Sequence, residues 1–120
     1  IDYGEKPAIN GDGSQSYDFI NVVDAARCNV LAIQADVTDE FYNVGTGIQT
    51  SIKELCNKIL KLKQSGLKVK YLPYDERDLR QLVKNRIGSI EKAKKDLGFI
   101  YNTKLEDGLQ NLIDWRDSKN

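Results

Sequence analysis

The chain has no histidine and no methionine, and its 120 residues include only two cysteines and two prolines. Without histidine it cannot form a Ser-His or Cys-His nucleophile, and it has no Cys-x-x-Cys pair to hold zinc. It opens on Ile1-Asp2-Tyr3, which is neither basic nor apolar, so no signal peptide is indicated there. We therefore expect no metal site, and we expect the chain to begin inside a longer gene product.

Long apolar runs are also missing, so no segment is expected to span a membrane. Basic and acidic residues number 18 each, which argues against a nucleic-acid partner attracted by the net charge. A local anion site remains compatible with this balance. The composition predicts one cytoplasmic globular domain over residues 1–120, with Cys28 and Cys56 as buried, reduced thiols.

Apolar spacing and capping residues predict alternating strands and helices. The first helix is expected over 22–34, with an apolar stripe of Val23, Ala26, Val30 and Ile33. A second helix is expected to begin at a capping box formed by Ser51 and Glu54, and a third is expected over 90–97. A fourth is expected from Leu105, with Leu112 and Trp115 on its buried side. Strands are expected at 7–10, 16–20, 41–44 and 67–72, the first two forming a hairpin around Asp12-Gly13, and residues 74–88 are expected to be mostly loop. This alternation indicates an α/β fold in which 41–44 is a central strand that needs neighbours.

The run from Gly11 to Asp24 reads Gly-Asp-Gly-Ser-Gln-Ser-Tyr-Asp-Phe-Ile-Asn-Val-Val-Asp. It resembles the Gly-Asp-Gly-x-Gln-x-Arg-Asp-Phe-Ile-x-Val-x-Asp pattern of the nucleotide-sugar epimerases and dehydratases, which are extended short-chain dehydrogenase/reductases. In that family the arginine contacts the substrate diphosphate, and here its place is taken by Tyr17. A phenol offers one neutral donor where a guanidinium offers a charged fork, so Tyr17 is expected to weaken or reassign that contact. Gln15 and Tyr17 are candidate substrate contacts, and the alternative is a purely structural role in a β-hairpin that leads into a helix.

A second stretch, Tyr42-Asn43-Val44-Gly45-Thr46-Gly47 followed by Ser51, is similar to the strand, turn and helix of the same family. The two glycines predict a tight turn rather than a phosphate cradle, because no Gly-Lys-Ser/Thr follows them. Asn43 is the candidate here, since its amide could reach a ligand or hold a loop.

A third stretch, residues 75–89, resembles the second phosphate-contacting region of the family, usually Arg-Pro-Gly-Asp followed by Val-Arg. The match leaves three candidates for the planar donor to a diphosphate: Arg77, Arg80 and Arg86. The alternative is a solvated cluster in which these arginines pair with neighbouring carboxylates.

The resemblance implies that the chain is the C-terminal, substrate-binding portion of an enzyme similar to UDP-glucose 4-epimerase, without most of the Rossmann domain. The family's glycine-rich NAD fingerprint and its catalytic Tyr-x-x-x-Lys are both absent, so NAD is expected to bind to the missing N-terminal domain. The implied partners are a nucleoside-diphosphate sugar and that Rossmann domain. The implied reaction is foremost epimerisation by transient oxidation, then dehydration or decarboxylation, and no catalytic residue is expected in this chain.

The alternative comes from a different class of function: a self-contained small α/β binding or interaction module without a catalytic role. The gene sequence upstream of Ile1 separates the two hypotheses, because only the enzyme predicts a glycine-rich fingerprint and a Tyr-x-x-x-Lys there. An unpaired strand at 41–44 would also recruit another chain, so a homodimer or a rearranged packing is expected in isolation.

Overall fold

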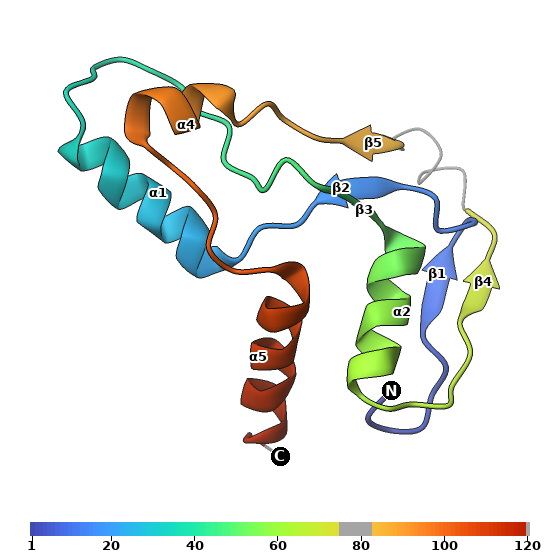
Figure 1. Cartoon of the computed structure of the whole chain (residues 1–120). Helices are drawn as coiled ribbons and strands as arrows, with labels where there is room; N and C mark the ends of the chain where they lie inside the picture. The colour runs from blue at the N-terminus through green and yellow to red at the C-terminus, as the bar shows by residue number, and fades with distance from the viewer. Residues whose placement is uncertain (75–82, 120) are drawn as a thin grey trace. The chain divides into compact units, whose positions relative to one another are not determined.

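The computed structural model describes residues 1–74 and 83–119, and it has the α/β composition expected (Figure 1). The elements in chain order are β1 (Ala8–Asn10), β2 (Ser16–Asp18), α1 (Val22–Gln34), β3 (Gln49–Ser51), α2 (Ile52–Leu62), β4 (Lys70–Leu72), β5 (Asn85–Arg86), α4 (Glu91–Leu97) and α5 (Leu105–Asp117). Among the described residues, no helix is long and apolar enough to cross a bilayer. The chain divides into two compact units, residues 1–17 with 50–86 and residues 18–49 with 87–120.

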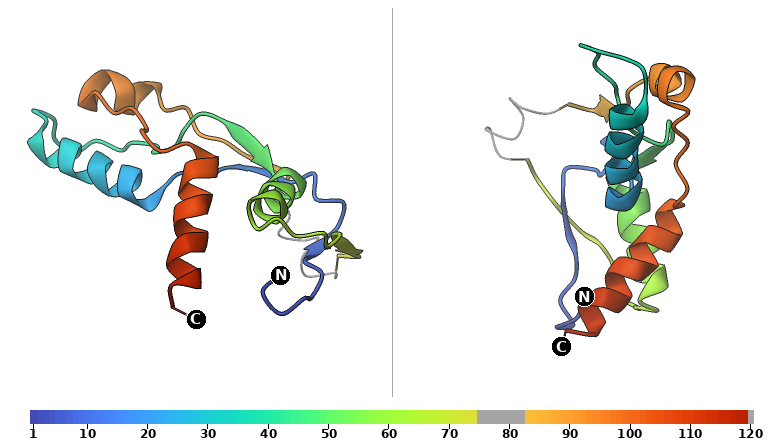
Figure 2. Two further views of the ribbon diagram at one scale, coloured as in Figure 1. Left: turned by 60° about the horizontal axis from the view of Figure 1, so that its bottom comes forward. Right: turned by 90° about the vertical axis from the view of Figure 1, so that its left-hand side faces the viewer.

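The first unit is built on parallel strand pairing. β1 pairs with β4 in the register Ile9↔Tyr71, and the two strands lie side by side in Figure 1 and in the left view of Figure 2. A second sheet has the order β3-β2-β5, with β2 and β5 parallel. The predicted hairpin of 7–10 with 16–20 is therefore wrong, because β1 and β2 belong to different sheets. β5 forms within residues 74–88, which were predicted to be mostly loop.

α2 begins where the capping box predicts. The Ser51 hydroxyl accepts a hydrogen bond from the Glu54 amide at 3.1 Å, and the Glu54 carboxylate accepts from the Ser51 amide at 2.8 Å. These bonds satisfy two amides that would otherwise lack partners at the helix start. The helix places Leu60 in the interior and leaves Cys56 half-buried, so the prediction of a buried thiol is wrong for Cys56 and confirmed for Cys28.

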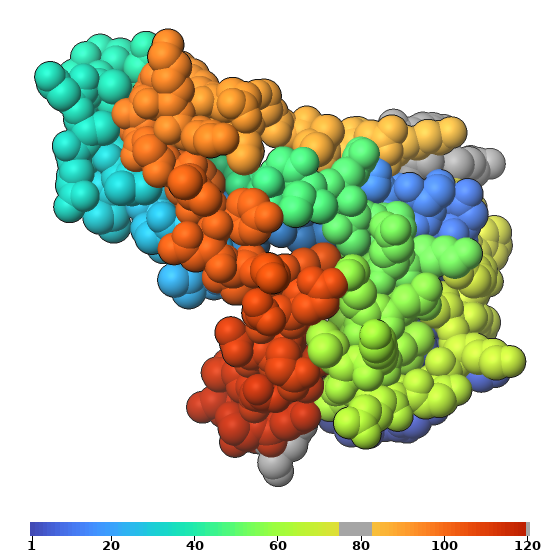
Figure 3. Space-filling model, in the orientation of Figure 1, coloured from blue at the N-terminus to red at the C-terminus, as the bar shows by residue number. Residues whose placement is uncertain are grey.

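The second unit has its core where α1 meets α4, and Figure 3 shows the orange α4 directly against the cyan α1. The buried members of this core are Cys28, Ala93, Leu97 and Phe99. Gly98 ends α4 in the left-handed region with φ 63°, as its position after Leu97 predicts. This turn lets Phe99 return into the core.

α1 has the predicted bounds but buries the opposite face. Its buried residues are Asp24 and Cys28, one helical turn apart, whereas Val23, Val30 and Ile33 of the predicted stripe are exposed, Ile33 by 84%. The prediction failed because periodicity identifies an apolar face but not what covers it. Here a carboxylate with several hydrogen-bond donors occupies the interior, and the apolar face is uncovered.

The segment Phe41–Val44 is not a strand, contrary to the prediction. Tyr42 and Val44 pack against the core of the second unit, and Phe41 is 90% exposed. Lys92 of α4 holds the segment, since its ammonium donates to the Phe41 carbonyl at 3.1 Å and lies 4.9 Å from the centre of the Tyr42 ring. Side-chain packing and the Lys92 ammonium therefore hold this segment, in place of the hydrogen bonds between strands that were expected.

α5 is present as predicted, but none of its residues is buried. Leu112 and Trp115, which were expected in a core, are both exposed. A helix with an apolar side and no cover for it presents a surface for another element.

Candidate functional site

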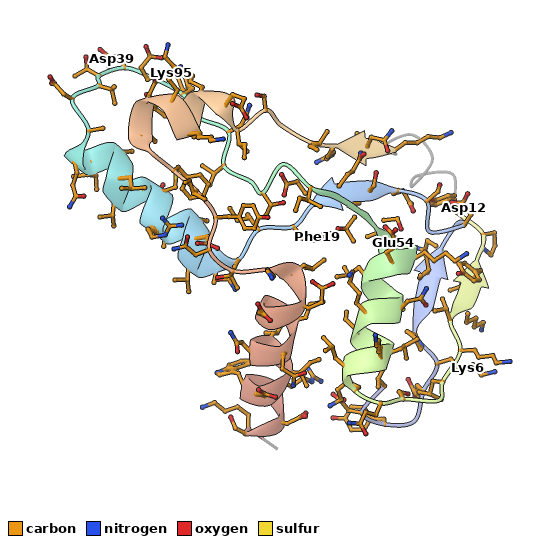
Figure 4. All side chains as sticks on the ribbon, viewed as in Figure 1. Lys6, Asp12, Phe19, Asp39, Glu54 and Lys95 are labelled. Carbon is orange, nitrogen blue, oxygen red and sulfur yellow. The ribbon has the colours of Figure 1, made fainter. Side chains whose placement is uncertain are left out.

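The glycine turn of the first unit is closed by the start of α2. Gly13 has φ 73°, and a Cβ on it would lie 3.1 Å from the Lys53 Cβ. Both the positive φ and the close approach of Lys53 therefore favour glycine at this position. The Lys53 amide donates to the Gly13 carbonyl at 3.0 Å, and the Ile52 amide donates to the Gln15 carbonyl at 2.8 Å. Figure 4 labels Asp12 on this turn and Glu54 at the start of α2. The first amides of α2 thus hold the turn and are not left for a phosphate.

β2 and β5 place two of the predicted site residues side by side. The register pairs Ser16 with Asn85 and Tyr17 with Arg86. The Ser16 amide donates to the Lys84 carbonyl at 2.8 Å, and the Ser16 hydroxyl donates to the Asn85 side-chain oxygen at 2.7 Å. Register partners in a parallel pair stand on one face about 4.8 Å apart, so Tyr17 and Arg86 project from the same face of this pair.

Arg77 and Arg80 lie outside the described residues, so the structure places only one of the three candidate arginines. Arg86 is exposed at its position beside Tyr17. The sequence offered no signal for this pairing, because it predicted a loop where β5 forms. Ser16 and Asn85, which set the register, were missed for the same reason.

Gln15 lies at the entrance to β2 and is 9% exposed. Its side-chain nitrogen donates to the hydroxyl of Tyr74, a residue that the sequence did not single out. The candidates Gln15, Tyr17 and Arg86 all belong to the first unit, on the glycine turn and the β2–β5 pair. This part of the chain therefore holds a guanidinium and a phenol on the β2–β5 pair, and a Gln15 amide that is engaged by Tyr74.

Asn43 belongs to the second unit. Its side chain lies against the backbone of Gly88, where an added Cβ would be 3.1 Å from the Asn43 Cγ. Of the two roles that the sequence left open, this contact favours holding the segment that follows β5. Glycine at 88 allows the close approach.

The turn Gly45-Thr46-Gly47 is held by Asp18. The Asp18 carboxylate accepts from the Thr46 amide at 2.9 Å, from the Thr46 hydroxyl at 2.6 Å and from the Gly47 amide at 2.8 Å. A Cβ on Gly45 would lie 2.3 Å from the Asp18 Oδ2. This turn is closed by the chain's own carboxylate, so it does not fit the pyrophosphate of a dinucleotide, which needs free amides.

Replacing Asp18 with asparagine is expected to destabilise this turn by about 1–2 kcal/mol, because an amide cannot accept all of these bonds and turns N–H groups toward donors. Hydrogen exchange at the Thr46 and Gly47 amides should become faster, with a lower Tm. Asp39→Asn is the matched control, since Asp39 is exposed and has a φ of 56° that asparagine tolerates. Unchanged exchange at both amides would show that the carboxylate does not hold the turn.

Asp24 is a second carboxylate whose role the sequence did not predict. It is 2% exposed, and it accepts from the Arg27 guanidinium at 2.9 Å and from the Asn102 and Thr103 amides at 3.0 and 2.9 Å. Burial by itself would raise the pKa of Asp24, but these donors outweigh it and lower the pKa to about 2. Asp24 thereby ties the start of α1 to the segment before α5.

The chain is similar to known proteins over most of its length. Residues 1–112 match the family model described as GDP-mannose 4,6 dehydratase. The UDP-glucuronate 4-epimerase of Thermodesulfobacterium geofontis is 32% identical over 94% of this chain and 34% of its own length.

Two solved structures are similar in fold and sequence. The UDP-glucose 4-epimerase of Thermotoga maritima, with UDP-glucose, has a TM-score of 0.87 and 29% identity over 98% of this chain and 37% of that one. The Bordetella bronchiseptica enzyme WbmF, in complex with NAD+ and UDP, has a TM-score of 0.81 and 29% identity over 98% and 33%. The chain spans about a third of the length of these relatives. It belongs to the family of the GDP-mannose 4,6-dehydratase model, among the nucleotide-sugar epimerases and dehydratases.

Proposed function

We propose that this chain is the part of an NAD-dependent nucleotide-sugar epimerase or dehydratase that grips the diphosphate of its substrate. The observation that carries the proposal is the parallel register of Tyr17 with Arg86 beside the glycine turn. The family pattern has a guanidinium at position 17, and here the neighbouring strand supplies one. A guanidinium binds phosphate oxygens through charge-assisted hydrogen bonds, about twice as strong as neutral ones.

Arg86 is therefore our choice among the three candidate arginines, with Tyr17 as a neutral donor to the same group. Gln15 contributes from the turn. Arg77 and Arg80 remain candidates for a second contact, and Asn43 acts by holding the segment around Gly88.

Hydride chemistry and NAD are assigned to another part of the protein. Neither glycine-containing turn fits a dinucleotide, since α2 amides close the first and Asp18 closes the second. The chain also lacks a Tyr-x-x-x-Lys. NAD, when bound to a Rossmann domain of the whole protein, supplies transient oxidation of the sugar, and this chain orients the substrate. Epimerisation is the foremost reaction of the whole protein, with dehydration or decarboxylation as the next alternatives. The protein is assigned to the cytoplasm.

The exposed apolar stripe of α1, made of Val23, Val30 and Ile33, supports a covering domain in the whole protein. We propose that the Rossmann domain packs there. In its absence the same stripe would favour a homodimer or a rearranged packing, replacing the strand edge expected at 41–44.

Titration of the 120-residue chain with UDP-glucose, followed by NMR amide shifts, tests the proposed function. Shifts are expected at residues 13–17 and 84–86. Uridine, which lacks the diphosphate, should bind at least about tenfold more weakly because it cannot use the guanidinium. Equal affinity for uridine, or no shift in this region at millimolar UDP-glucose, would contradict the proposal.

A further inference from the structure

β5 is a strand whose register is not fixed by burial. It consists of Asn85 and Arg86, and in the order β3-β2-β5 it lies at an edge of the sheet that the described residues form. The residues from 83 to 87 are all exposed, Val83 by 41% and Ile87 by 50%. Burial of one face specifies the register of a strand strongly, and a strand without a buried face is prone to slip. A contact other than apolar packing must therefore hold Arg86 beside Tyr17.

That contact is a hydrogen bond between two polar side chains. Ser16 on β2 is 8% exposed, and its hydroxyl donates to Asn85 Oδ1 at 2.7 Å. Its amide donates to the Lys84 carbonyl at 2.8 Å. Because alternate residues of a strand point to opposite faces, the side-chain bond lies on one face and the Tyr17–Arg86 pair on the other. A slip of β5 by one residue would break the bond and turn the Arg86 side chain to the wrong face.

We propose that Asn85 is a positioning residue for diphosphate binding: by accepting the hydrogen bond from Ser16, it holds β5 in the register that presents the Arg86 guanidinium to the ligand. The inference rests on the proposed function and explains how so short an edge strand can carry the phosphate donor. In this role Asn85 does not touch the diphosphate. It raises the fraction of molecules in which Arg86 is correctly placed, and the apparent affinity is proportional to that fraction.

NMR titration of the 120-residue chain with UDP-glucose and with uridine measures this role. Asn85→Leu replaces the amide by an apolar group of the same branched shape, and it should weaken UDP-glucose binding about 3- to 10-fold, as the loss of one neutral hydrogen bond. The affinity for uridine, which lacks the diphosphate, should change by less than about twofold. A packing role alone would lower both affinities together. Asn57→Leu is the matched control, since Asn57 is an exposed asparagine of the same unit, and it should bind both ligands like the wild type.

The donor side of the bond offers a rescue. Valine and threonine are both β-branched and nearly equal in shape, and only threonine keeps the hydroxyl, so Ser16→Val should bind UDP-glucose about 3- to 10-fold more weakly than Ser16→Thr. In the Arg86→Ala background, Asn85→Leu should change the affinity by less than about twofold, because no guanidinium is left to position. Hydrogen exchange at the Ser16 amide, measured without ligand, should become faster in Asn85→Leu, because its bond to the Lys84 carbonyl depends on the same register.

The outcomes separate the two ideas. If UDP-glucose does not bind to the wild-type chain, or binds equally well to Arg86→Ala, the proposed function fails and the positioning role fails with it. If binding depends on Arg86 but Asn85→Leu and Ser16→Val bind UDP-glucose like the wild type, the diphosphate grip stands and the positioning role of Asn85 is overturned. An equal loss for UDP-glucose and uridine in Asn85→Leu, or an undiminished loss in the Arg86→Ala background, also overturns it.

Discussion

Replacing Arg86 with alanine is expected to weaken UDP-glucose binding by about 10- to 100-fold. The reason is the loss of a charge-assisted hydrogen bond to phosphate, worth about 1.5–3 kcal/mol. Arg86→Lys should retain part of the affinity, since an ammonium keeps the charge but loses the planar fork. The dissociation constants come from the NMR titration used for the wild-type chain.

A rescue experiment tests the pairing itself. In the Arg86→Ala background, Tyr17→Arg should recover most of the affinity, because a guanidinium on β2 then stands about one strand spacing away on the same face. Lys95→Ala on α4 is the control for loss of a positive charge, since Lys95 is exposed in the second unit. The assignment is wrong if Arg86→Ala binds like the wild type, or if Lys95→Ala loses as much.

Asp24→Ala is expected to lower the free energy of unfolding of the chain by about 3 kcal/mol. The substitution leaves the Asn102 and Thr103 amides without their acceptor and frees the Arg27 guanidinium. Urea unfolding monitored by circular dichroism measures the change. Asp36→Ala, at an exposed position after α1, should stay within about 0.5 kcal/mol of the wild type. A similar loss in both variants would contradict a specific role for Asp24.

The same carboxylate makes stability depend on acid pH. The pKa of Asp24 is lowered in the folded state to about 2 from an ordinary value of 3.8. The contribution is therefore complete above pH 3.8 and is lost as the pH falls toward 2, amounting to about 2 kcal/mol. Asp24→Asn should remove this part of the acid dependence. If the free energy of unfolding changes equally between pH 5 and pH 2 in the wild type and in Asp24→Asn, the lowered pKa is refuted.

The sequence predicted the helices well because their signals are local. The helical spacing of apolar residues predicted the bounds of α1, and the capping box at Ser51 predicted the start of α2. The structure adds Asn21 as the N-cap of α1, since its side chain accepts from the Val23 amide at 2.9 Å. Gly98 ends α4 for the same kind of reason. The ordered motifs also identified the family, which the family model and the relatives confirm.

The sequence by itself thus determined where helices begin and end, the α/β class, the family, and the absence of histidine chemistry. Only the tertiary structure decided that α1 buries Asp24 and exposes Ile33, that 41–44 is held by packing rather than a ladder, and that Arg86 stands beside Tyr17. Caps and turns depend on residues within a few positions of each other, so a single chain reveals them. Burial and strand register depend on partners as far apart as 69 positions, as for Ser16 and Asn85, and no local period encodes them.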